Sequence, residues 1–406
     1  MKTNVAVFFG GRSVEHEISV ISALQAINAF DKEKYNVIPV YISKKGRWYT
    51  GDELLNIRNY KDMDALVSKA TEVYMRPEYG DYNLYSTQTS MFSKHPKIVA
   101  ELHAVIPVLH GTNGEDGVFE GLLDTIGIPY AGCNTLSAAN GMDKITMKMI
   151  LRSEGLPVVD YVWFTDKKWY ANRDEIIKQI EDKLEYPVIV KPANLGSSVG
   201  IGKATDRESL IGAIDNAARF SQRLIVEKMI RDLKEINCSV LGDADDHQAS
   251  VCEEPVRSGD FLSYEDKYMG GSSTKGAPAK SAPVSTAGMQ GSERRVPADL
   301  PEEVSDKIRH LAAETFRVLS CHGVSRVDVM VDNADGNIYI NEINTIPGSL
   351  SYYLWEASGV SFDKLMDRLV QLALRRKRDT DRKTFTYDRN IFALTGGVKG
   401  GVKMRK

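Results

Sequence analysis

Short runs of apolar residues, each ended by glycine or polar residues, recur along the first third of the chain. Such runs are typical of buried parallel strands, and the clearest three are NVAVFFGG, NVIPVYI and HAVIPVLHG. A helix is expected after the first run, because apolar residues recur there on one helical face: Val20, Ile21, Leu24 and Ile27. GVFEGLLDTIG predicts a further helix that ends at Gly127. This alternation of strands and helices predicts a doubly wound α/β sheet.

Residues 46–97 interrupt the alternation. They are polar and rich in aromatic residues and show no clean hydrophobic period. We therefore expect an irregular excursion there, inside a first block that spans residues 1–141.

The second block, residues 142–232, predicts a smaller sheet with helices on one face. DKITMKMILRSEG predicts a helix closed by Gly155, and RLIVEKMI predicts a strand. YPVIVKPA predicts another strand, with GIGKA as its antiparallel partner. Thr205 and Glu208 have the spacing of a capping box at the start of the next helix.

The third block, residues 233–375, begins with EINCSVLGD. Residues 269–290 are rich in Gly, Ser, Ala, Pro and Lys, a composition that indicates a mobile loop rather than a core. A long amphipathic helix follows, with apolar residues expected to face inward: Val304, Ile308, Leu311, Phe316 and Leu319. SRVDVMVD, the turn NADGN and NIYINEIN then predict a hairpin, and residues 361–374 predict a closing helix.

Composition and charge narrow the class of protein. A length of 406 residues suggests two or three domains, and 42% hydrophobic with 26% charged residues is ordinary for globular proteins. A net charge of −3 gives no argument for a nucleic-acid partner. The four cysteines lack metal-ligand spacing and are expected to be reduced, buried thiols. With no signal peptide or apolar run of membrane-spanning length, we expect a soluble cytoplasmic protein without a membrane partner.

The end of the chain, taken as a tail over residues 376–406, is basic. A solvated end is the favoured interpretation. A contact with nucleic acid or an anionic membrane would need aromatic or amphipathic support that the tail provides only weakly.

The predicted hairpin carries the most informative polar residues. Side chains two apart on a strand share a face, so Glu342 lies beside Asn344, and Arg326 lies beside Asp328. A three-residue loop at 334–336 would place Asp328 opposite Glu342 and Arg326 opposite Asn344. Two adjacent carboxylates repel unless a hard divalent cation lies between them. The alternatives are a solvated face or salt bridges with Arg326.

A glycine-rich loop, ANLGSSVG, follows Lys191 at the end of a predicted strand. It matches neither the P-loop nor the dinucleotide-binding fingerprint. Gly196 and Gly200 nevertheless let successive backbone N–H groups turn toward phosphate oxygens. The alternative is an ordinary tight hairpin with an exposed lysine.

Two polar loops, GGRSVEHE and HGTNGEDG, follow strands of the first block at the edge where open α/β sheets bind ligands. Glu15 could hold a substrate ammonium group there, or it could simply interact favourably with a helix dipole. His110 is a second candidate, unless its ring is satisfied within its own loop.

Eight motifs in this order and spacing resemble those of the D-alanine–D-alanine ligases, which are ATP-grasp enzymes. The motifs are GGRSVEHEIS, HGTNGEDG, GMDK, VKPANLGSSVGIGK, EKMI, YEDKY, SRVDVMV and NEINTIPG. The resemblance covers residues 4–374 apart from 46–97. It implies an ATP-grasp fold, with an N-terminal doubly wound, Rossmann-like α/β domain (1–141) and two α+β domains (142–232 and 233–375) that enclose ATP. Residues 263–296 would form a lid.

The resemblance also implies residue roles. For ATP it implies the following contacts: Lys144, Lys191, Ser198 and Lys267 at the phosphates, Glu227 with the backbone of Lys228, Met229 and Ile230 at the adenine, and Glu235 at the ribose. For two Mg²⁺ (or Mn²⁺) ions it implies Asp328, Glu342 and Asn344, in agreement with the hairpin argument.

The implied reaction has two steps. The carboxylate of a first D-alanine attacks the γ-phosphate to give an acyl phosphate and ADP, and the amine of a second D-alanine then displaces phosphate. Glu15 would anchor the first ammonium group together with Ser197 and Tyr268. Arg326 and the Gly348 backbone N–H would stabilise the oxyanion. The family also implies a homodimer formed through the first block.

Two departures concern the second substrate. NTIPGSLSYYLW places Tyr352 and Tyr353 where the family commonly has a His-Ser pair, whose serine helps to hold the second carboxylate. The lid is also longer than usual by about twenty residues of flexible composition. D-serine or a larger second amino acid is therefore an alternative. Tyr268 favours an amine nucleophile, since relatives that make D-alanine–D-lactate carry histidine there.

Two further hypotheses come from other classes. A non-catalytic ATP-binding module is disfavoured because the metal face and Lys267 are complete. An NAD-dependent dehydrogenase lacks its glycine fingerprint after the first strand.

Overall fold

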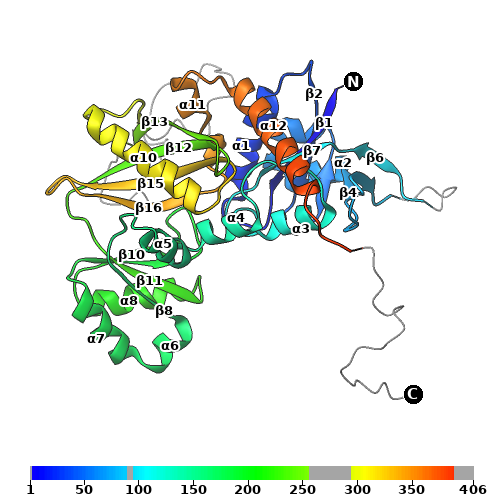
Figure 1. Ribbon diagram of the computed structural model, residues 1–406. Helices are drawn as coiled ribbons and strands as arrows, with labels where there is room; N and C mark the ends of the chain where they lie inside the picture. The colour runs from blue at the N-terminus through cyan, green and yellow to red at the C-terminus, as the bar shows by residue number, and fades with distance from the viewer. Residues whose placement is uncertain (1, 89–94, 256–293, 388–406) are drawn as a thin grey trace, which may run out of the picture.

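The computed structural model describes residues 2–88, 95–255 and 294–387, arranged around three β-sheets (Figure 1). Each sheet lies within one of the three blocks expected from the sequence. The predicted loop at residues 269–290 and the last part of the predicted tail lie outside the described residues. Within the described ranges, no helix combines the length and the apolar character that crossing a membrane requires. All four cysteines are buried thiols, as expected.

The first sheet has seven strands in the order β6-β5-β4-β3-β2-β1-β7. Its central strand β1 (Thr3–Gly10) pairs in parallel with β2 (Tyr35–Ile42) on one side and β7 (Ala104–Val108) on the other. Helix α1 (His16–Ala29) packs on one face of this parallel part and α3 (Val118–Ile126) packs on the other. The predicted doubly wound sheet is confirmed.

The described residues between 46 and 97 are not irregular, and the prediction of an irregular excursion was wrong there. They hold most of an antiparallel extension of the first sheet, made of short elements: β3 (Trp48–Thr50), η1 (Asp52–Leu55), η2 (Ile57–Lys61), α2 (Met63–Lys69), β4 (Thr71–Tyr74), β5 (Asn83–Ser86) and β6 (Ile98–Glu101). Strands of three or four residues are too short to show a period of two, so pairing with neighbours decides their structure.

The second sheet is antiparallel, in the order β10-β9-β11-β8. Its elements are β8 (Tyr161–Thr165), β9 (Val188–Pro192), β10 (Gly202–Ala204) and β11 (Arg223–Lys228), with helices α6 (Asp166–Ala171), α7 (Arg173–Lys183) and α8 (Arg207–Ala217). These three helices share one core with the sheet, as predicted. The capping box of α8 is formed by Asp206 and Ser209 rather than Thr205 and Glu208, because Asp206 is the residue that directly precedes the helix.

Helix α4 (Thr135–Met142) leads into α5 (Lys144–Ser153), the helix predicted from DKITMKMILRSEG. Ile145 of α5 packs with Tyr161 and Ile225 against the opposite face of the second sheet from α7. Helix α5 therefore brings its lysines between the second sheet and the third.

The third sheet has the order β14-β13-β12-β15-β16. Its strands are β12 (Leu233–Gly242), β13 (His247–Pro255), β14 (Arg294–Arg295), β15 (Gly323–Asp332) and β16 (Ile338–Asn344). The predicted amphipathic helix is α10 (Glu302–Val318), and it packs into the core of this sheet. A turn, η4 (Gly348–Ser351), and a short helix, α11 (Tyr352–Ala357), follow β16.

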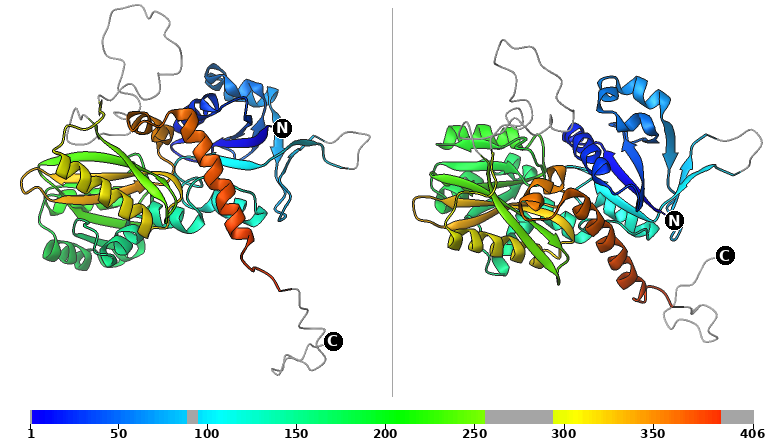
Figure 2. Two further views of the ribbon diagram at one scale, coloured as in Figure 1. Left: turned by 45° about the horizontal axis from the view of Figure 1, so that its top comes forward. Right: turned by 90° about the horizontal axis from the view of Figure 1, so that it is seen from above.

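The closing helix α12 (Phe362–Asp381) continues beyond its predicted end at Leu374. It packs beside α1, in a core that also includes Val324 of the third sheet. Figures 1 and 2 show α12 running along the junction between the first sheet, with its helices, and the third sheet. Arg376 donates hydrogen bonds to the carbonyls of Tyr130 and Gly132. The first residues of the predicted solvated tail are therefore helical and bonded to the body of the protein.

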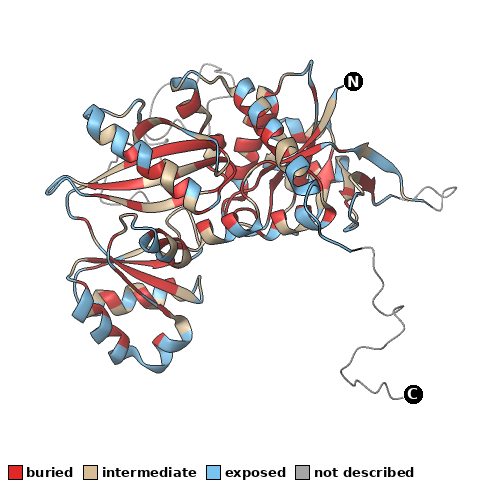
Figure 3. Ribbon diagram, viewed as in Figure 1, coloured by how far each residue is buried: buried red, intermediate tan, exposed pale blue. Residues whose placement is uncertain are grey.

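Buried residues follow the strands of all three sheets and the inward faces of the helices (Figure 3). Polar residues are buried as well, and several of them belong to the motifs identified in the sequence. Glu15, His110, Lys144, Lys191 and Glu227 are among them.

Candidate active site

Three loops meet at the carboxylate of Glu15, the residue before α1. The Ser197 hydroxyl of the glycine-rich loop donates a hydrogen bond to Glu15. A Cβ atom at Gly111 would lie 2.6 Å from Glu15 Oε2, and one at Gly196 would lie 3.1 Å away. The absence of side chains at both glycines therefore lets the loops approach this carboxylate from two sides.

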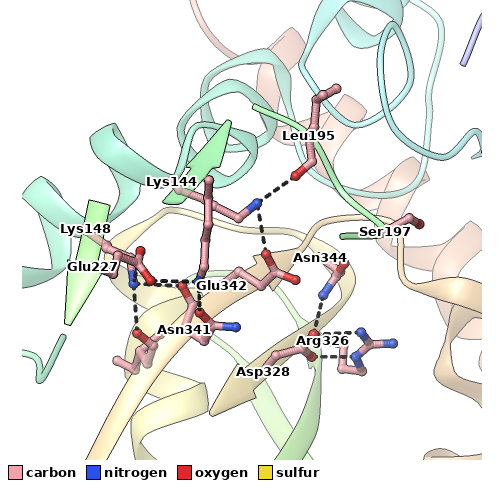
Figure 4. Close-up of polar contacts among 12 residues, drawn as sticks. Lys144, Lys148, Leu195, Ser197, Glu227, Arg326, Asp328, Asn341, Glu342 and Asn344 are labelled. Atoms are coloured by element: carbon pink, nitrogen blue, oxygen red, sulfur yellow. Dashed lines mark hydrogen bonds and ion pairs between the residues drawn. The ribbon is translucent and has the colours of Figure 1, made fainter. Parts of the chain in front are cut away.

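Lys144, the first residue of α5, joins the glycine-rich loop to the hairpin of the third sheet (Figure 4). Its Nζ lies 2.9 Å from Glu342 Oε2 and donates to the Leu195 carbonyl at 2.9 Å. Burial lowers the pKa of Lys144, but the charge of Glu342 more than offsets this, so its pKa is raised. The lysine is a fixed cation at the mouth of the loop.

A second cluster surrounds the buried carboxylate of Glu227 on β11 (Figure 4). Lys191 Nζ lies 2.7 Å from one carboxylate oxygen, and Lys148 Nζ lies 3.3 Å from the other. Burial raises the pKa of Glu227, but the two lysines outweigh it and bring the pKa to about 2. Lys191 also donates to Asn341 Oδ1 at 3.0 Å.

Sequence reasoning missed Lys148 and Asn341. Lys148 is fully buried and donates to the carbonyls of Ile340 at 3.4 Å and Asn341 at 3.1 Å. A sequence signal existed, since Lys148 follows Lys144 by four residues and so lies on the same face of α5. No local pattern indicates that the Asn341 side chain would contact Lys191.

The hairpin has the predicted register at the site, with Arg326 opposite Asn344 and Asp328 opposite Glu342. Near the turn, however, Val331 pairs with Ile338, one residue out of the register that a three-residue loop would give. A bulge between the two regions restores the expected pairing. The prediction was correct at the site because two local deviations cancel.

Both carboxylates of the hairpin have cationic partners. Arg326 makes a bidentate contact with Asp328, at 2.6 and 2.8 Å, and Asn344 Nδ2 donates to Asp328 at 3.1 Å (Figure 4). Burial lowers the pKa of Arg326, but Asp328 more than offsets this and raises it. The salt-bridge alternative weighed from the sequence is therefore present, with Lys144 as the partner of Glu342.

The donor set also suits a hard divalent cation. Asp328, Glu342 and the Asn344 amide supply oxygen donors on one face of two adjacent strands. Magnesium is usually bound by one or two carboxylates together with substrate phosphates. Among the described residues, no group of three or more His, Cys, Asp or Glu side chains could hold a metal, so an ion here would need such additional ligands.

His110 is satisfied within the protein, as the alternative interpretation expected. Its Nδ1 lies 2.9 Å from the Ile346 carbonyl and its Nε2 lies 2.9 Å from Ser22 Oγ. Burial lowers the pKa of His110 to about 4, so the ring is neutral near pH 7. The histidine ties the loop after β7 to the loop after β16.

Glu115, which was not identified from the sequence, also connects the loop after β7 to the loop after β16. Its carboxylate accepts hydrogen bonds from the Gly111 and Ile346 N–H groups, at 2.9 and 3.0 Å. Burial, and next the charge of Glu15, raise its pKa to about 8. Glu115 belongs to the motif HGTNGEDG, but Ile346, which donates to it, is more than two hundred residues away in the sequence. The motif therefore gave no sign of this contact.

Backbone in the left-handed region is concentrated in the two loops that carry candidate residues. Ser197 and Ser198 have φ of 53° and 60°. Three successive residues after Gly348, numbered 349–351, have φ of 52°, 52° and 51°. Such conformations cost free energy in non-glycine residues and persist where surrounding contacts fix them, often at functional sites.

The remaining predicted residues that the structure describes lie at the end of β11, directly after it and on β12. Lys228 ends β11, Met229 and Ile230 follow it, and Glu235 lies on β12. Met229 N donates to the Pro187 carbonyl at 3.3 Å, and Ile230 is buried against Met330. Lys267, Tyr268 and residues 263–293 of the expected lid lie outside the described residues.

Family models and relatives match almost the whole chain. The model for the D-ala D-ala ligase N-terminus matches residues 4–133, and the model for the C-terminus matches residues 150–371. The D-alanine–D-alanine ligase of Thermosipho melanesiensis is 38% identical, covering 97% of this chain and 99% of the relative. That of Ruminiclostridium cellulolyticum is 41% identical, covering 95% and 100%.

Solved structures of ligases from this family are also similar to the chain. VanG D-Ala:D-Ser ligase from Enterococcus faecalis superimposes with a TM-score of 0.75 at 31% identity, covering 92% of this chain and 100% of that one. The D-alanine–D-alanine ligase from Coxiella burnetii gives a TM-score of 0.74 at 30% identity, covering 94% and 96%.

Proposed function

The chain belongs to the D-alanine–D-alanine ligase family and has its ATP-grasp fold, and we propose that it uses ATP to join two D-alanines for peptidoglycan precursor synthesis. The observation that carries the proposal is Lys144, which joins the glycine-rich loop beside Glu15 to the acidic hairpin. A cation in this position can lie between a phosphate chain and an amino-acid carboxylate. We retain residues 1–141, 142–232 and 233–375 as proposed domains.

ATP would lie between the second and third sheets. Lys144, Lys191 and Lys267 would neutralise the phosphates, and Ser198 would contribute from the glycine-rich loop. Glu227 and the backbone of residues 228–230 would hold the adenine, and Glu235 the ribose. In the structure Glu227 is engaged by Lys191 and Lys148, so binding of adenine to this carboxylate would involve a shift of these contacts.

Asp328, Glu342 and Asn344 would hold Mg²⁺ or Mn²⁺, which when bound neutralises charge on the phosphates. Arg326 and Lys144 contact the same carboxylates in the structure. Both cations would then be available to substrate oxygens.

In the first step, a carboxylate oxygen of D-alanine attacks the γ-phosphorus, the bond to the β-γ bridging oxygen breaks, and ADP leaves. Glu15, held by Ser197, would bind the ammonium group of this D-alanine, with Tyr268 completing the set. The two negatively charged reactants repel in water, and the lysines remove that repulsion.

In the second step, the amine of the second D-alanine, having lost a proton, attacks the acyl carbon, and phosphate leaves. Arg326 and the Gly348 N–H would stabilise the oxyanion that forms. An acyl phosphate hydrolyses readily, so residues 263–296 would serve to exclude water.

D-serine as the second substrate is the alternative that a specific observation favours. One of the solved relatives is a D-Ala:D-Ser ligase, and Tyr352 and Tyr353 replace the residues common in the family at that position. We also propose that the protein is a cytoplasmic homodimer that associates through residues 1–141, which sedimentation or light scattering would test.

Phosphate release from Mg-ATP tests the proposal. We expect release with D-alanine alone, accompanied by D-alanyl-D-alanine. Release only after another amino acid is added would keep the chemistry and change the acceptor. If no amino acid causes phosphate release while Mg-ATP still raises the melting temperature, the protein would instead be a non-catalytic ATP-binding module.

A further inference from the structure

A row of polar residues crosses the third sheet, and the sequence had indicated only two of its members. Glu342 on β16 lies opposite Asp328 on β15, Asp328 lies opposite Asn237 on β12, and Asn237 lies opposite Glu253 on β13. Residues directly opposite in an antiparallel sheet share a face. The row therefore leads from the phosphate side, at Lys144 and Glu342, across the sheet to Glu253.

Glu253 forms the far end of this row and is buried, with 4% of its surface exposed. Its Oε1 accepts hydrogen bonds from Asn237 Nδ2 at 2.7 Å and from the Tyr353 hydroxyl at 2.9 Å. Its Oε2 has no hydrogen-bond partner within the described part of the chain. A buried carboxylate is costly unless a cation compensates it.

Arg294 supplies that cation. Its Nη1 lies 3.7 Å from Glu253 Oε2, and its guanidinium carbon lies 4.4 Å from the centre of the Tyr353 ring. Stacking on an aromatic ring fixes the plane of a guanidinium and leaves its edge for hydrogen bonding. The side chain is 23% exposed.

The chemistry of the second step calls for such a group. The acceptor amino acid brings its own carboxylate, which needs a cation on the side of the acyl carbon away from the departing phosphate. Lys144 and Lys191 lie on the phosphate side, and Arg326 lies between the two sides, paired with Asp328. Arg294 is a described cation at the other edge of the sheet, on β14, three strand spacings or roughly 14 Å from Asp328 on β15.

We propose that Arg294 binds the carboxylate of the second amino acid, and that Glu253 and Tyr353 are positioning residues that fix its guanidinium. This inference rests on the proposed ligase function and assigns the acceptor site of the same reaction. An arginine fork favours a planar, bidentate partner, so the site requires an acceptor with a free carboxylate. Arg294 would therefore select acceptors by their carboxylate more than by their side chain.

Competition between two acceptors tests the proposal. D-Alanine and D-alaninamide, in which an uncharged amide replaces the carboxylate, are supplied together with Mg-ATP, and the two dipeptide products are quantified by mass spectrometry. The product ratio reports relative kcat/KM for the acceptors and does not depend on how much enzyme is folded. We expect wild-type enzyme to favour D-alanine strongly.

Arg294→Gln is expected to reduce this preference roughly 10- to 100-fold, the range for loss of one charge-assisted contact. The KM for ATP and the KM for the first D-alanine should change little. Arg294→Lys, which keeps the charge without the fork, should give an intermediate ratio and serves if the glutamine variant does not fold. The matched control is Arg309→Gln, an exposed arginine of α10 paired with Asp306, which should behave as wild type.

An unchanged product ratio in both Arg294 variants would overturn the assignment while leaving the ligase function intact. A loss of preference in Arg309→Gln equal to that in Arg294→Gln would also overturn it, because the effect would then follow from the loss of any arginine. Failure of wild-type enzyme to make any dipeptide from D-alanine is a separate result, and it would contradict the proposed function itself.

Discussion

At the scale of single residues, Lys148 has the largest consequence among those that the sequence did not reveal. Its ammonium group is fully buried between Glu227 and two backbone carbonyls of β16. Burial lowers the pKa of Lys148, and Glu227 counteracts this only in part. A buried charge of this kind is tolerated only because its partners are already in place.

Lys148→Met should therefore be strongly destabilising, by about 3–5 kcal/mol, because it leaves Glu227 with one cation fewer and two carbonyls without a donor. Mg-ATP should also raise its melting temperature less than it raises that of wild type. Lys178→Met is the matched control, since Lys178 is exposed and its ion pair in the described part of the chain is with Asp182, one turn away. Equal melting temperatures for the two variants would show that the buried cluster contributes little.

Glu120 on α3 predicts a dependence of stability on pH. It is buried, and desolvation raises its pKa to about 8 from the ordinary value of 4.5 for a glutamate. The folded state thus binds the proton more tightly than the unfolded state. The resulting stabilisation is fully present below about pH 4.5 and is lost as the pH rises through about 8.

We expect the melting temperature of wild type to fall between pH 6 and pH 9, and that of Glu120→Gln to fall less, because glutamine does not ionise. Glu208→Gln, at an exposed position on α8, should retain the full slope. Thermal melts at both pH values make the comparison. A glutamine variant with the slope of wild type would assign the pH dependence to other groups.

At the scale of elements, α12 shows why the end of a helix is difficult to place from sequence. Its apolar period ends near Leu374, but the helix continues to Asp381. Tertiary contacts extend it: the Arg376 guanidinium lies 4.0 Å above the Tyr130 ring and donates to carbonyls at 2.6 and 2.7 Å. Basic composition alone favoured a solvated tail.

Arg376→Ala should lower the free energy of unfolding by about 1–3 kcal/mol, because the Tyr130 and Gly132 carbonyls lose their donors. Activity per folded molecule should be retained, since the described contacts of Arg376 are with Tyr130 and Gly132, which are not candidate active-site residues. Urea unfolding curves measure the difference, and Arg378→Ala, two residues further along and exposed, is the control. A variant as stable as the control would mean that the tail contacts are incidental.

Prediction of elements succeeded for continuous apolar runs and for most long amphipathic helices. The strands β1, β2 and β7 and the helices α1 and α10 were correctly predicted. The strands β3 to β6 and β8 were missed, because a strand of three to five residues owes its structure to its neighbours. Two longer elements, the strand β13 and the helix α7, were also missed. The capping box of α8 was misplaced by one residue for a similar reason, since two adjacent polar pairs fit the same pattern.

At the scale of the whole molecule, the candidate site joins loops from all three sheets. Motifs identified residues within each loop, such as Glu15, Lys144 and Asp328. Contacts between distant loops were beyond sequence reasoning, as the bond from Ile346 to Glu115 and the Tyr353–Glu253–Arg294 cluster show. A local motif predicts which residue types lie close together in one segment. A contact between segments distant in the sequence depends on how the sheets pack and cannot be predicted from such a motif.

The measurement that tests the central claim most directly is oxygen transfer from D-alanine to phosphate. D-Alanine labelled with ¹⁸O in both carboxylate oxygens is incubated with Mg-ATP and the enzyme, and the released phosphate is analysed by mass spectrometry. Attack of the carboxylate on the γ-phosphate predicts one ¹⁸O atom in each phosphate released, matched by one D-alanyl-D-alanine. Dipeptide accompanied by unlabelled phosphate would contradict an acyl phosphate intermediate.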